Sequence, residues 1–376
     1  MPGVVVIDDR TVQITTVGPY PQLPELLGAP SYGIVSRQAF GGGLRRRHRR
    51  VRPFRLTERN DDGTVVKVEP VDAAAVRANG VELRRYPSTT AAYEAFQGGE
   101  VDWVLAPPTM VDEAIATYGD RYVTPFEGTQ FFAFNLAQPI FADVRFRRAI
   151  VQAVDREALA AQLSGRSPSD GIVPPGVPGF VDDACGEVCA YDPSAASALV
   201  AEAFPDGNVP SIEIAVPDDP TSPVPQRQLA ETMATQLGAV GIPATVVAKP
   251  LFEFRRYAVS GQAQLFSYGW QGMAPDADAF LTPQFRTDAP DNVTRLASPD
   301  VDALLAAARA QPDPELRAQA YAEAEKQILA LVPVVPLAAF RTNAVASEAV
   351  RELHPRLDGT FDVTVVWVAP EAPAEG

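Results

Sequence analysis

The stretch of sequence that decides the fold is Phe131–Arg156, FFAFNLAQPIFADVRFRRAIVQAVDR. Its first residues, Phe131–Leu136, are mostly aromatic and apolar, which predicts a buried β-strand. From Val144 to Val154, apolar residues recur at the spacing of one buried helix face. These residues are Phe146, Ala149, Ile150, Ala153 and Val154. A strand that leads into an amphipathic helix is typical of a mixed α/β chain.

Further strands and helices are predicted on both sides of this stretch. The chain opens on a β-hairpin, in which VVVI and RTVQITTV flank an Asp-Asp turn. Helices are predicted to begin at Asp192-Pro193 and Ser298-Pro299, where a capping residue precedes a proline, and another spans Glu315–Leu331. The other predicted strands are Thr64–Val71, Val81–Tyr86, Val101–Leu105, Ser211–Val216, Ala244–Lys249, Ala263–Tyr268, Val334–Phe340 and Val363–Val368.

The composition is that of an acidic, soluble globular protein. Of the 376 residues, 46% are hydrophobic and 21% are charged, and the formal net charge is −15 at pH 7. The 47 acidic residues outnumber the 32 lysines and arginines, and this imbalance opposes binding to polyanions. We therefore predict no nucleic-acid partner.

One arginine-rich segment departs from this acidic balance. Residues 41–55 read GGGLRRRHRRVRPFR and hold seven arginines. Out-of-frame translation of GC-rich DNA yields runs of Arg, Gly, Pro and Ala, so we interpret residues 38–52 as a frameshift scar or a divergent surface loop. The alternative is a basic recognition patch, which the acidic remainder of the chain opposes.

No segment has the sequence of a membrane span or a signal peptide. The longest apolar run, Ile328–Phe340, has 13 residues and is broken by two prolines, whereas a spanning helix needs about 20. The opening MPGVVVIDDR lacks a basic region and a long apolar region, so we predict no signal peptide in this chain.

The sequence contains none of the common catalytic motifs. GxSxG, HExxH, GxxxxGK[ST] and a strand-linked GxGxxG are absent, and the two histidines, His48 and His354, lie far apart. We predict no catalytic residues, no metal site and no cofactor. Cys185 and Cys189 are too few for structural zinc, and they form either a disulfide, if the protein is exported, or two unrelated thiols.

The opening stretch resembles a segment of the extracytoplasmic solute-binding proteins of the peptide/nickel class (family 5), the ligand receptors of ABC importers. In that family a strand ending in Asn precedes a proline-containing apolar stretch and an Arg-x-Ala helix that closes on Asp-Arg. The matching residues are Asn135, Pro139, Phe141, Arg147, Ala149, Asp155 and Arg156. Similar segments follow the family's order over most of residues 64–368: QGGEVDWV (97–104), GIVPPGVPGF (171–180), YDPSAASALVAEAF (191–204), 263–285 around Trp270, SPDVDALLAAA (298–308) and VPVVPL (332–337).

The resemblance implies an α/β, two-lobed, periplasmic-binding-protein-like fold of the class II type. We expect residues 1–125 to form a partial lobe I, 126–340 to form the ligand-binding lobe II, and 341–376 to return to lobe I. Residues 1–35 resemble the family's middle portion, so we expect an incomplete N-terminal lobe that lacks its first part, the small extra domain and the signal or lipoprotein segment. Unpaired sheet edges would make such a chain poorly soluble alone.

The resemblance also implies a function. We expect non-catalytic capture of a small or peptide-like solute by a monomeric, extracytoplasmic receptor, which closes about a hinge and delivers its ligand to ABC permease subunits. Export would favour the disulfide between Cys185 and Cys189. The alternative is the ligand-sensing domain of a cytoplasmic transcriptional regulator, although no helix-turn-helix pattern is visible.

Six residues are predicted to lie near the ligand. They are Phe131, Asn135 (at the hinge), Tyr268, Trp270, Gln271 and Met273. Phe266, Tyr268 and Trp270 alternate along one predicted strand, so they share one side of a sheet, as either a core stripe or the aromatic wall of a cleft. Arg147 and Asp155 are interpreted as structural residues.

Met273 argues against one class of ligand. In peptide-binding members of the family, the residue three positions after this tryptophan is an aspartate that pairs with the peptide's α-ammonium group. A methionine cannot make this charge-assisted contact. We therefore predict that free peptide N-termini are not captured in that way, unless Asp276 or Asp278 replaces the missing carboxylate.

Overall fold

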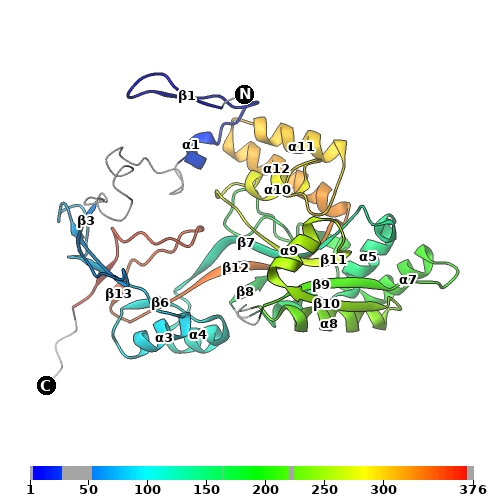
Figure 1. The fold of residues 1–376 in the computed structure, drawn as a ribbon, viewed down its shortest axis with the longest axis horizontal. Helices are drawn as coiled ribbons and strands as arrows, with labels where there is room; N and C mark the ends of the chain where they lie inside the picture. Colours follow the sequence, from blue (N-terminus) through cyan, green and yellow to red (C-terminus); the bar gives the residue numbers. More distant parts are fainter. Residues whose placement is uncertain (1–2, 28–52, 164, 220–223, 371–376) are drawn as a thin grey trace.

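The computed structural model describes residues 3–27, 53–163, 165–219 and 224–370. The arginine-rich segment 38–52 lies outside these residues. Figure 1 shows a mixed α/β molecule in which a long sheet joins a larger part, with helices on both sides, to a smaller part that contains β6, α3 and α4. This confirms the predicted fold class.

The central sheet is mixed and has seven strands. Its order is β10-β9-β11-β7-β12-β6, and β8 pairs with β12 beside this path. Parallel pairs join β9 to β10 and β11, and the other pairs are antiparallel. The strands are β6 (Trp103–Leu105), β7 (Tyr122–Phe134), β8 (Arg166–Pro168), β9 (Ile212–Asp218), β10 (Ala244–Pro250), β11 (Leu265–Gln271) and β12 (Val334–Ala346).

Helices cover this sheet and form the large hydrophobic core with it. The buried face predicted from the Val144–Val154 pattern is confirmed, because Phe146, Ala149 and Ile150 are fully buried. The predicted starts at Pro193 and Pro299 are also confirmed, each with its capping side chain in place. The helices are α5 (Val144–Ala153), α6 (Arg156–Ala160), α7 (Pro193–Ala203), α8 (Gln226–Ala239), α9 (Leu251–Val259), α10 (Asp278–Phe285), α11 (Pro299–Ala310) and α12 (Pro314–Ala330).

Two smaller cores lie where β7 begins and β12 ends. One forms where α3 (Thr89–Gln97) and α4 (Val111–Tyr118) pack on β6 and on Val345. The other gathers Tyr122, Ala344 and Leu353 with neighbouring residues. The two long strands therefore begin in one packed unit and end in another.

The remaining elements lie outside these cores. The N-terminal hairpin is confirmed as β1 (Val4–Val6) paired with β2 (Val12–Ile14), and both strands are exposed. The predicted strand Val363–Val368 is reduced to Trp367–Val368, since the preceding residues form a turn. The others are α1 (Leu23–Leu27), β3 (Phe54–Arg59), β4 (Val65–Pro70), β5 (Val81–Arg84), β13 (Val350–Arg351) and the short 3₁₀ segments η2 (Pro108–Met110), η3 (Pro139–Phe141) and η4 (Gly186–Val188).

Arg147 and Asp155 have structural positions. The Arg147 guanidinium donates to the carbonyl oxygens of Phe141, Leu331 and Val332 at 2.5–3.0 Å and so ties α5 to the end of α12. The Asp155 carboxylate caps α6 by accepting from the backbone N–H of Ala158. Both arrangements agree with the structural interpretation of these residues.

A disulfide joins Cys185 and Cys189 around η4, with the two Cα atoms 5.5 Å apart. Both residues are buried against the large core. The short loop that the bond closes removes little conformational entropy from the unfolded chain, so its contribution to stability is small.

Candidate functional site

Strands β7 and β12 are the main connection between the packed units. Tyr122 and Ala344 belong to a small core, whereas Phe132 and Val335 belong to the large one. The β7–β12 pairing shifts register twice, between Pro336 and Ala338 and between Ala339 and Arg341. Such irregularities interrupt the ladder and bend the strands. We call Thr124–Gly128 of β7 and Ala339–Asn343 of β12, which lie next to these shifts, the crossing segments.

A cavity of about 410 Å³ lies against the crossing segments. Its walls come from the large unit, from the α3–β6 region and from the C-terminal loop near residue 358, so it is a crevice between packed units. It is lined by Thr89, Leu105, Ala106, Pro108, Phe126, Gly165, Arg166, Phe340, Arg341, Thr342, Asn343, Asp358 and Gly359. We call it the crossing cavity.

The aromatic wall of the crossing cavity is built around Phe340. The ring stacks on Phe126 at 6.3 Å between centroids, and the guanidinium of Arg166 lies over the Phe340 ring at 4.6 Å from its centre. A Cβ atom on Gly128 would meet the Phe340 ring at 2.5 Å, so only glycine leaves room for the ring here. The sequence thus places a flat apolar surface beside a cation.

Four side chains of this cavity have buried polar atoms without a hydrogen-bond partner among the described residues. These atoms are Nε of Arg166, Nε of Arg341, Oγ1 of Thr342 and Oδ1 of Asn343. Buried polar groups are normally paired with protein or with water. Four side chains with such an unpaired atom therefore line one crevice.

The charges around the cavity are unevenly paired. Burial lowers the pKa of Arg166, and no described carboxylate offsets this effect. Burial, followed by the charge of Asp358, raises the pKa of the nearby Glu127 to about 7. The carboxylate of Asp358 accepts hydrogen bonds from the backbone N–H and the hydroxyl of Thr360.

A second cavity of about 330 Å³ shares part of this wall. Ala339, Phe340 and Arg341 line it from β12, and Pro175 lines it from the Pro-Pro-Gly loop.

In the part of the chain that the structure describes, no group of three His, Cys, Asp or Glu side chains could hold a metal ion. Nor does any helix there combine the length and hydropathy of a membrane span.

Phe131 and Asn135 are placed in the interior, away from the crossing segments. Each is only 1% exposed. The Asn135 amide donates to the carbonyl oxygens of Gly261 and Ala263 at 2.7 and 2.9 Å, and this fastens the loop before β11. Asn135 follows the end of β7 that packs in the large core, and its role at the hinge stays a prediction.

Tyr268 and Trp270 lie on the other face of the sheet from Phe340. Tyr268 pairs with Phe131 and Trp270 pairs with Thr129, whereas Gly128, which faces the Phe340 ring, pairs with Gln271. Paired residues point to the same face, and successive residues point to opposite faces. The indole of Trp270 is half-buried against the large core and donates to the carbonyl oxygen of Ala279 at 2.7 Å. This geometry favours the core stripe over the aromatic cleft wall.

Gln271 and Met273 remain accessible. Gln271 is exposed and shares the face of Gly128 and Phe340, which makes it the predicted residue best oriented toward the crossing cavity. Met273 is 63% exposed in the loop after β11. Neither residue lines the two cavities described above.

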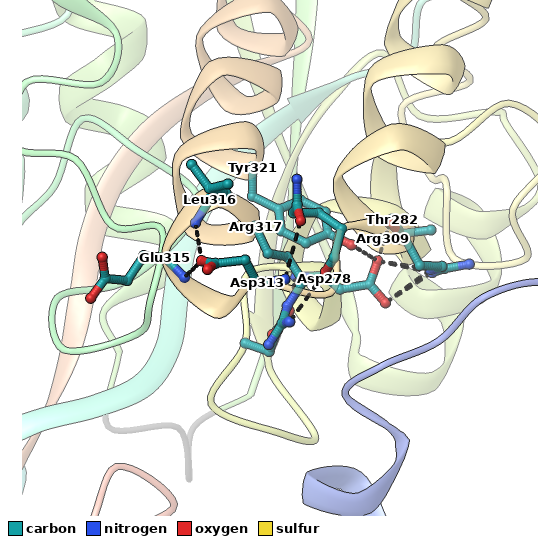
Figure 2. Close-up of polar contacts among 10 residues, drawn as sticks. Asp278, Thr282, Arg309, Asp313, Glu315, Leu316, Arg317 and Tyr321 are labelled. Carbon is teal, nitrogen blue, oxygen red and sulfur yellow. Dashed lines mark hydrogen bonds and ion pairs between the residues drawn. The ribbon is translucent and has the colours of Figure 1, made fainter.

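Asp276 and Asp278 are committed to buried ion pairs, as Figure 2 shows for Asp278 and its partners. Both oxygens of Asp278 face the Arg309 guanidinium at 2.9–3.2 Å, and its Oδ1 also accepts from the hydroxyls of Thr282 and Tyr321. Asp276 pairs with Arg317 at 3.3 Å. These carboxylates hold the loop after Trp270 against α11 and α12, so neither is free to replace a carboxylate at Met273.

A buried carboxyl group supports the Pro-Pro-Gly loop that reaches the second cavity. Oε1 of Glu325, on α12, accepts from the backbone N–H groups of Ile172 and Val173 at 2.5 and 2.9 Å, and Oε2 has no partner among the described residues. Burial raises the pKa of Glu325 to about 7, although the two N–H groups oppose the shift. Glu325 therefore gains a proton much more readily in the folded protein.

Glu325 is expected to make stability depend on pH between 4.5, the ordinary pKa of a glutamate side chain, and about 7, its pKa in the folded protein. In this window the folded state binds more protons than the unfolded state, so the free energy of unfolding decreases as pH rises. One pKa unit corresponds to about 1.4 kcal/mol, so we expect a loss on the order of 3 kcal/mol. Urea unfolding at pH 4.5, 5.5, 6.5 and 7.5 would measure it.

Glu325→Gln should flatten this profile, because an amide cannot titrate and keeps an acceptor for the two N–H groups. Part of the slope remains, since burial also raises the pKa of Glu127. Glu323→Gln, on the exposed side of the same helix, is the matched control and should leave the profile unchanged. An unaltered pH dependence in Glu325→Gln would contradict the assignment.

None of the six residues predicted to lie near the ligand lines the crossing cavity, so the sequence interpretation missed all of its lining residues, including Arg166 and Phe340. A signal was present, because the apolar run Val334–Ala339 continues directly into the polar residues Arg341, Thr342 and Asn343. A strand that changes from apolar to polar without ending indicates a segment that leaves a core and enters a crevice. The stacking of Arg166 on Phe340 had no signal in the sequence, since 174 residues separate them.

The comparisons with known proteins agree with one another. The chain is 27% identical over 349 residues to "Probable deoxycholate-binding periplasmic protein YgiS" of Escherichia coli K12, covering 89% of this chain and 64% of that protein. It is 23% identical over 380 residues to "Dipeptide-binding protein DppE" of Bacillus subtilis 168, covering 93% and 67%. The chain therefore spans about two thirds of the length of these curated relatives.

A solved structure shares the fold of this chain, and a family model assigns its family. The solved structure of HbpA2 from Haemophilus parasuis superposes with a TM-score of 0.84 at 21% identity, covering 98% of this chain and 75% of that one. The model for bacterial extracellular solute-binding proteins, family 5 Middle, matches residues 1–292. The chain belongs to the family 5 bacterial extracellular solute-binding proteins.

Proposed function

We propose that the chain is the solute-binding component of an ABC-type importer and captures its ligand without catalysis. The observation that carries this proposal is the crossing cavity, a crevice between packed units that is lined by an aromatic wall and by four side chains with an unpartnered polar atom each. Crevices of this size with a few convergent polar groups suit small-molecule ligands. Family membership supports a receptor over the alternative of a regulator's sensing domain.

Closure about the crossing segments would couple binding to delivery. In this proposal residues 126–340 form one lobe, and residues 1–125 and 341–376 form the other. The register shifts in β7 and β12 are suitable flexing points between them. A ligand that contacts both lobes selects the closed state, which the importer's permease subunits would recognise. We propose that the receptor acts as a monomer outside the cytoplasm.

A thermal-shift panel tests this function. The panel contains di- to pentapeptides, N-acetylated peptides, deoxycholate, oligosaccharides and metal chelates. A ligand present at 100 times its dissociation constant stabilises the folded protein by about 2.7 kcal/mol, which is readily detected. Deoxycholate and dipeptides are included because the relatives' names mention them. If no compound in the panel raises the melting temperature, the proposal fails.

Free-amine peptides are expected to bind no better than their N-acetylated versions. Met273 offers no charge, and the carboxylates of Asp276 and Asp278 are held by Arg317 and Arg309. An ammonium group buried at this position without a partner would cost several kcal/mol. Calorimetric titration of matched peptide pairs measures the difference. A clear preference for the free amine that is lost in Asp276→Asn would contradict this prediction.

A further inference from the structure

The guanidinium of Arg166 is largely buried and has no polar partner among the described residues. Arg147 donates to three backbone carbonyls, and Arg309 forms a two-pronged pair with Asp278. Arg156 donates to the carbonyl oxygen of Cys189 and faces Asp170 and Asp183. The fold supplies acceptors to these three guanidinium groups, whereas Arg166 lines the crossing cavity without an acceptor among the described residues.

The surroundings of Arg166 position it well. It lies on β8, next to Phe340 of β12 in the ladder, and its guanidinium rests on the Phe340 ring at 4.6 Å. An aromatic face holds the planar group by cation–π attraction and leaves its edge available for hydrogen bonds. Thr342, which is only 5% exposed and has an unpartnered hydroxyl, lines the same cavity. A second cation, Arg341, lines it too.

We infer that Arg166 recognises a carboxylate group of the ligand, whose apolar body lies against Phe126 and Phe340. This inference rests on the proposed function and names the class of solute: amphipathic carboxylates. A planar guanidinium and a planar carboxylate form two parallel hydrogen bonds, and these strengthen in a partly dehydrated site. Asp358, which also lines the cavity, disfavours a second anionic group near it and so orients the ligand.

Two matched pairs of probes test the inference. N-acetyl-Phe-Ala is compared with its C-terminal amide, and deoxycholate is compared with its primary amide, by calorimetric titration of the full chain. For any pair whose members bind to the wild type, we expect the dissociation constant of the free acid to be at least about tenfold lower than that of the amide. Arg166→Gln should abolish the preference, and Arg166→Lys should keep part of it because it retains the charge without the planar fork. Arg256→Gln, an exposed arginine on α9, is the control and should preserve the preference.

The outcomes separate the inference from the proposed function. Equal binding of acid and amide by the wild type, or an acid preference that survives in Arg166→Gln, overturns the inference and leaves solute binding standing. If wild type binds none of the four probes, the inference is also overturned, whereas the proposed function still depends on the wider panel. Circular dichroism melting of each variant identifies any loss of folding, and Arg166→Lys then provides the comparison if Arg166→Gln does not fold.

Discussion

Replacing Asp278 with alanine is expected to lower the free energy of unfolding by about 3–5 kcal/mol. Asp278 is 4% exposed, and its carboxylate accepts hydrogen bonds from Arg309, Thr282 and Tyr321, which lie on α11, α10 and α12 (Figure 2). Its removal leaves the Tyr321 and Thr282 hydroxyls without an acceptor and Arg309 without its counter-ion. Burial and the neighbouring Asp278 charge already raise the pKa of Tyr321, so this hydroxyl stays protonated as a donor.

Urea unfolding of Asp278→Ala, Arg309→Ala and the double variant measures this effect. The two residues share one ion pair, so the double variant should lose less stability than the sum of the single variants. Asp61→Ala, an exposed carboxylate in the turn between β3 and β4, should change stability by no more than about 0.5 kcal/mol. Additive losses in the double variant would show that the ion pair does not act as a unit.

Replacing Arg147 with methionine should also destabilise the fold, by about 3–5 kcal/mol. The long apolar side chain fills the same space, but the carbonyl oxygens of Phe141, Leu331 and Val332 lose their shared donor. An unpaired buried acceptor costs about 1–3 kcal/mol. Since these carbonyls lie at the end of α12 and in η3, both elements should loosen together.

Arg145→Met is the matched control for Arg147→Met. Arg145 lies on the same helix but is exposed, and its pair with Asp143 is a surface salt bridge. Such pairs contribute about 0–1 kcal/mol. Denaturant midpoints of the two variants should therefore differ clearly, and a loss in Arg147→Met no larger than in Arg145→Met would contradict the role given to the buried guanidinium.

Local patterns in the sequence predicted the elements of the large core well. The Phe146–Ile150 face, the Pro193 and Pro299 helix starts and the β1–β2 hairpin all follow from periodicity, capping and turn residues close together in the chain. The full lengths of β7 and β12 were not predictable in this way. Their crossing segments mix Pro125, Glu127 and Gly128 with apolar residues, and their strand structure depends on a partner 200 residues away.

The candidate site was less predictable than the fold. Alternation correctly grouped Tyr268 and Trp270 on one side of a strand, but it could not tell which side faces the crevice. The side that faces the crevice is identified by the pairing of β11 with β7 and by the contact between Gly128 and Phe340. Both interactions join residues that are far apart in the sequence. The unpartnered atoms of Arg166 and Thr342 likewise become visible only when distant segments meet.

The central claim, that ligand is captured in the crossing cavity, is tested most directly by calorimetric titration of Phe340→Ala with the compound that gives the largest thermal shift. Phe340 lines both cavities and forms their shared aromatic wall. A buried aromatic contact of this kind contributes more than about 1.4 kcal/mol to binding, so the dissociation constant should rise at least about tenfold. Phe252→Ala, which removes an aromatic ring that is 82% exposed on α9, should leave affinity unchanged. Wild-type affinity in a folded Phe340→Ala variant would place the ligand elsewhere and contradict the account.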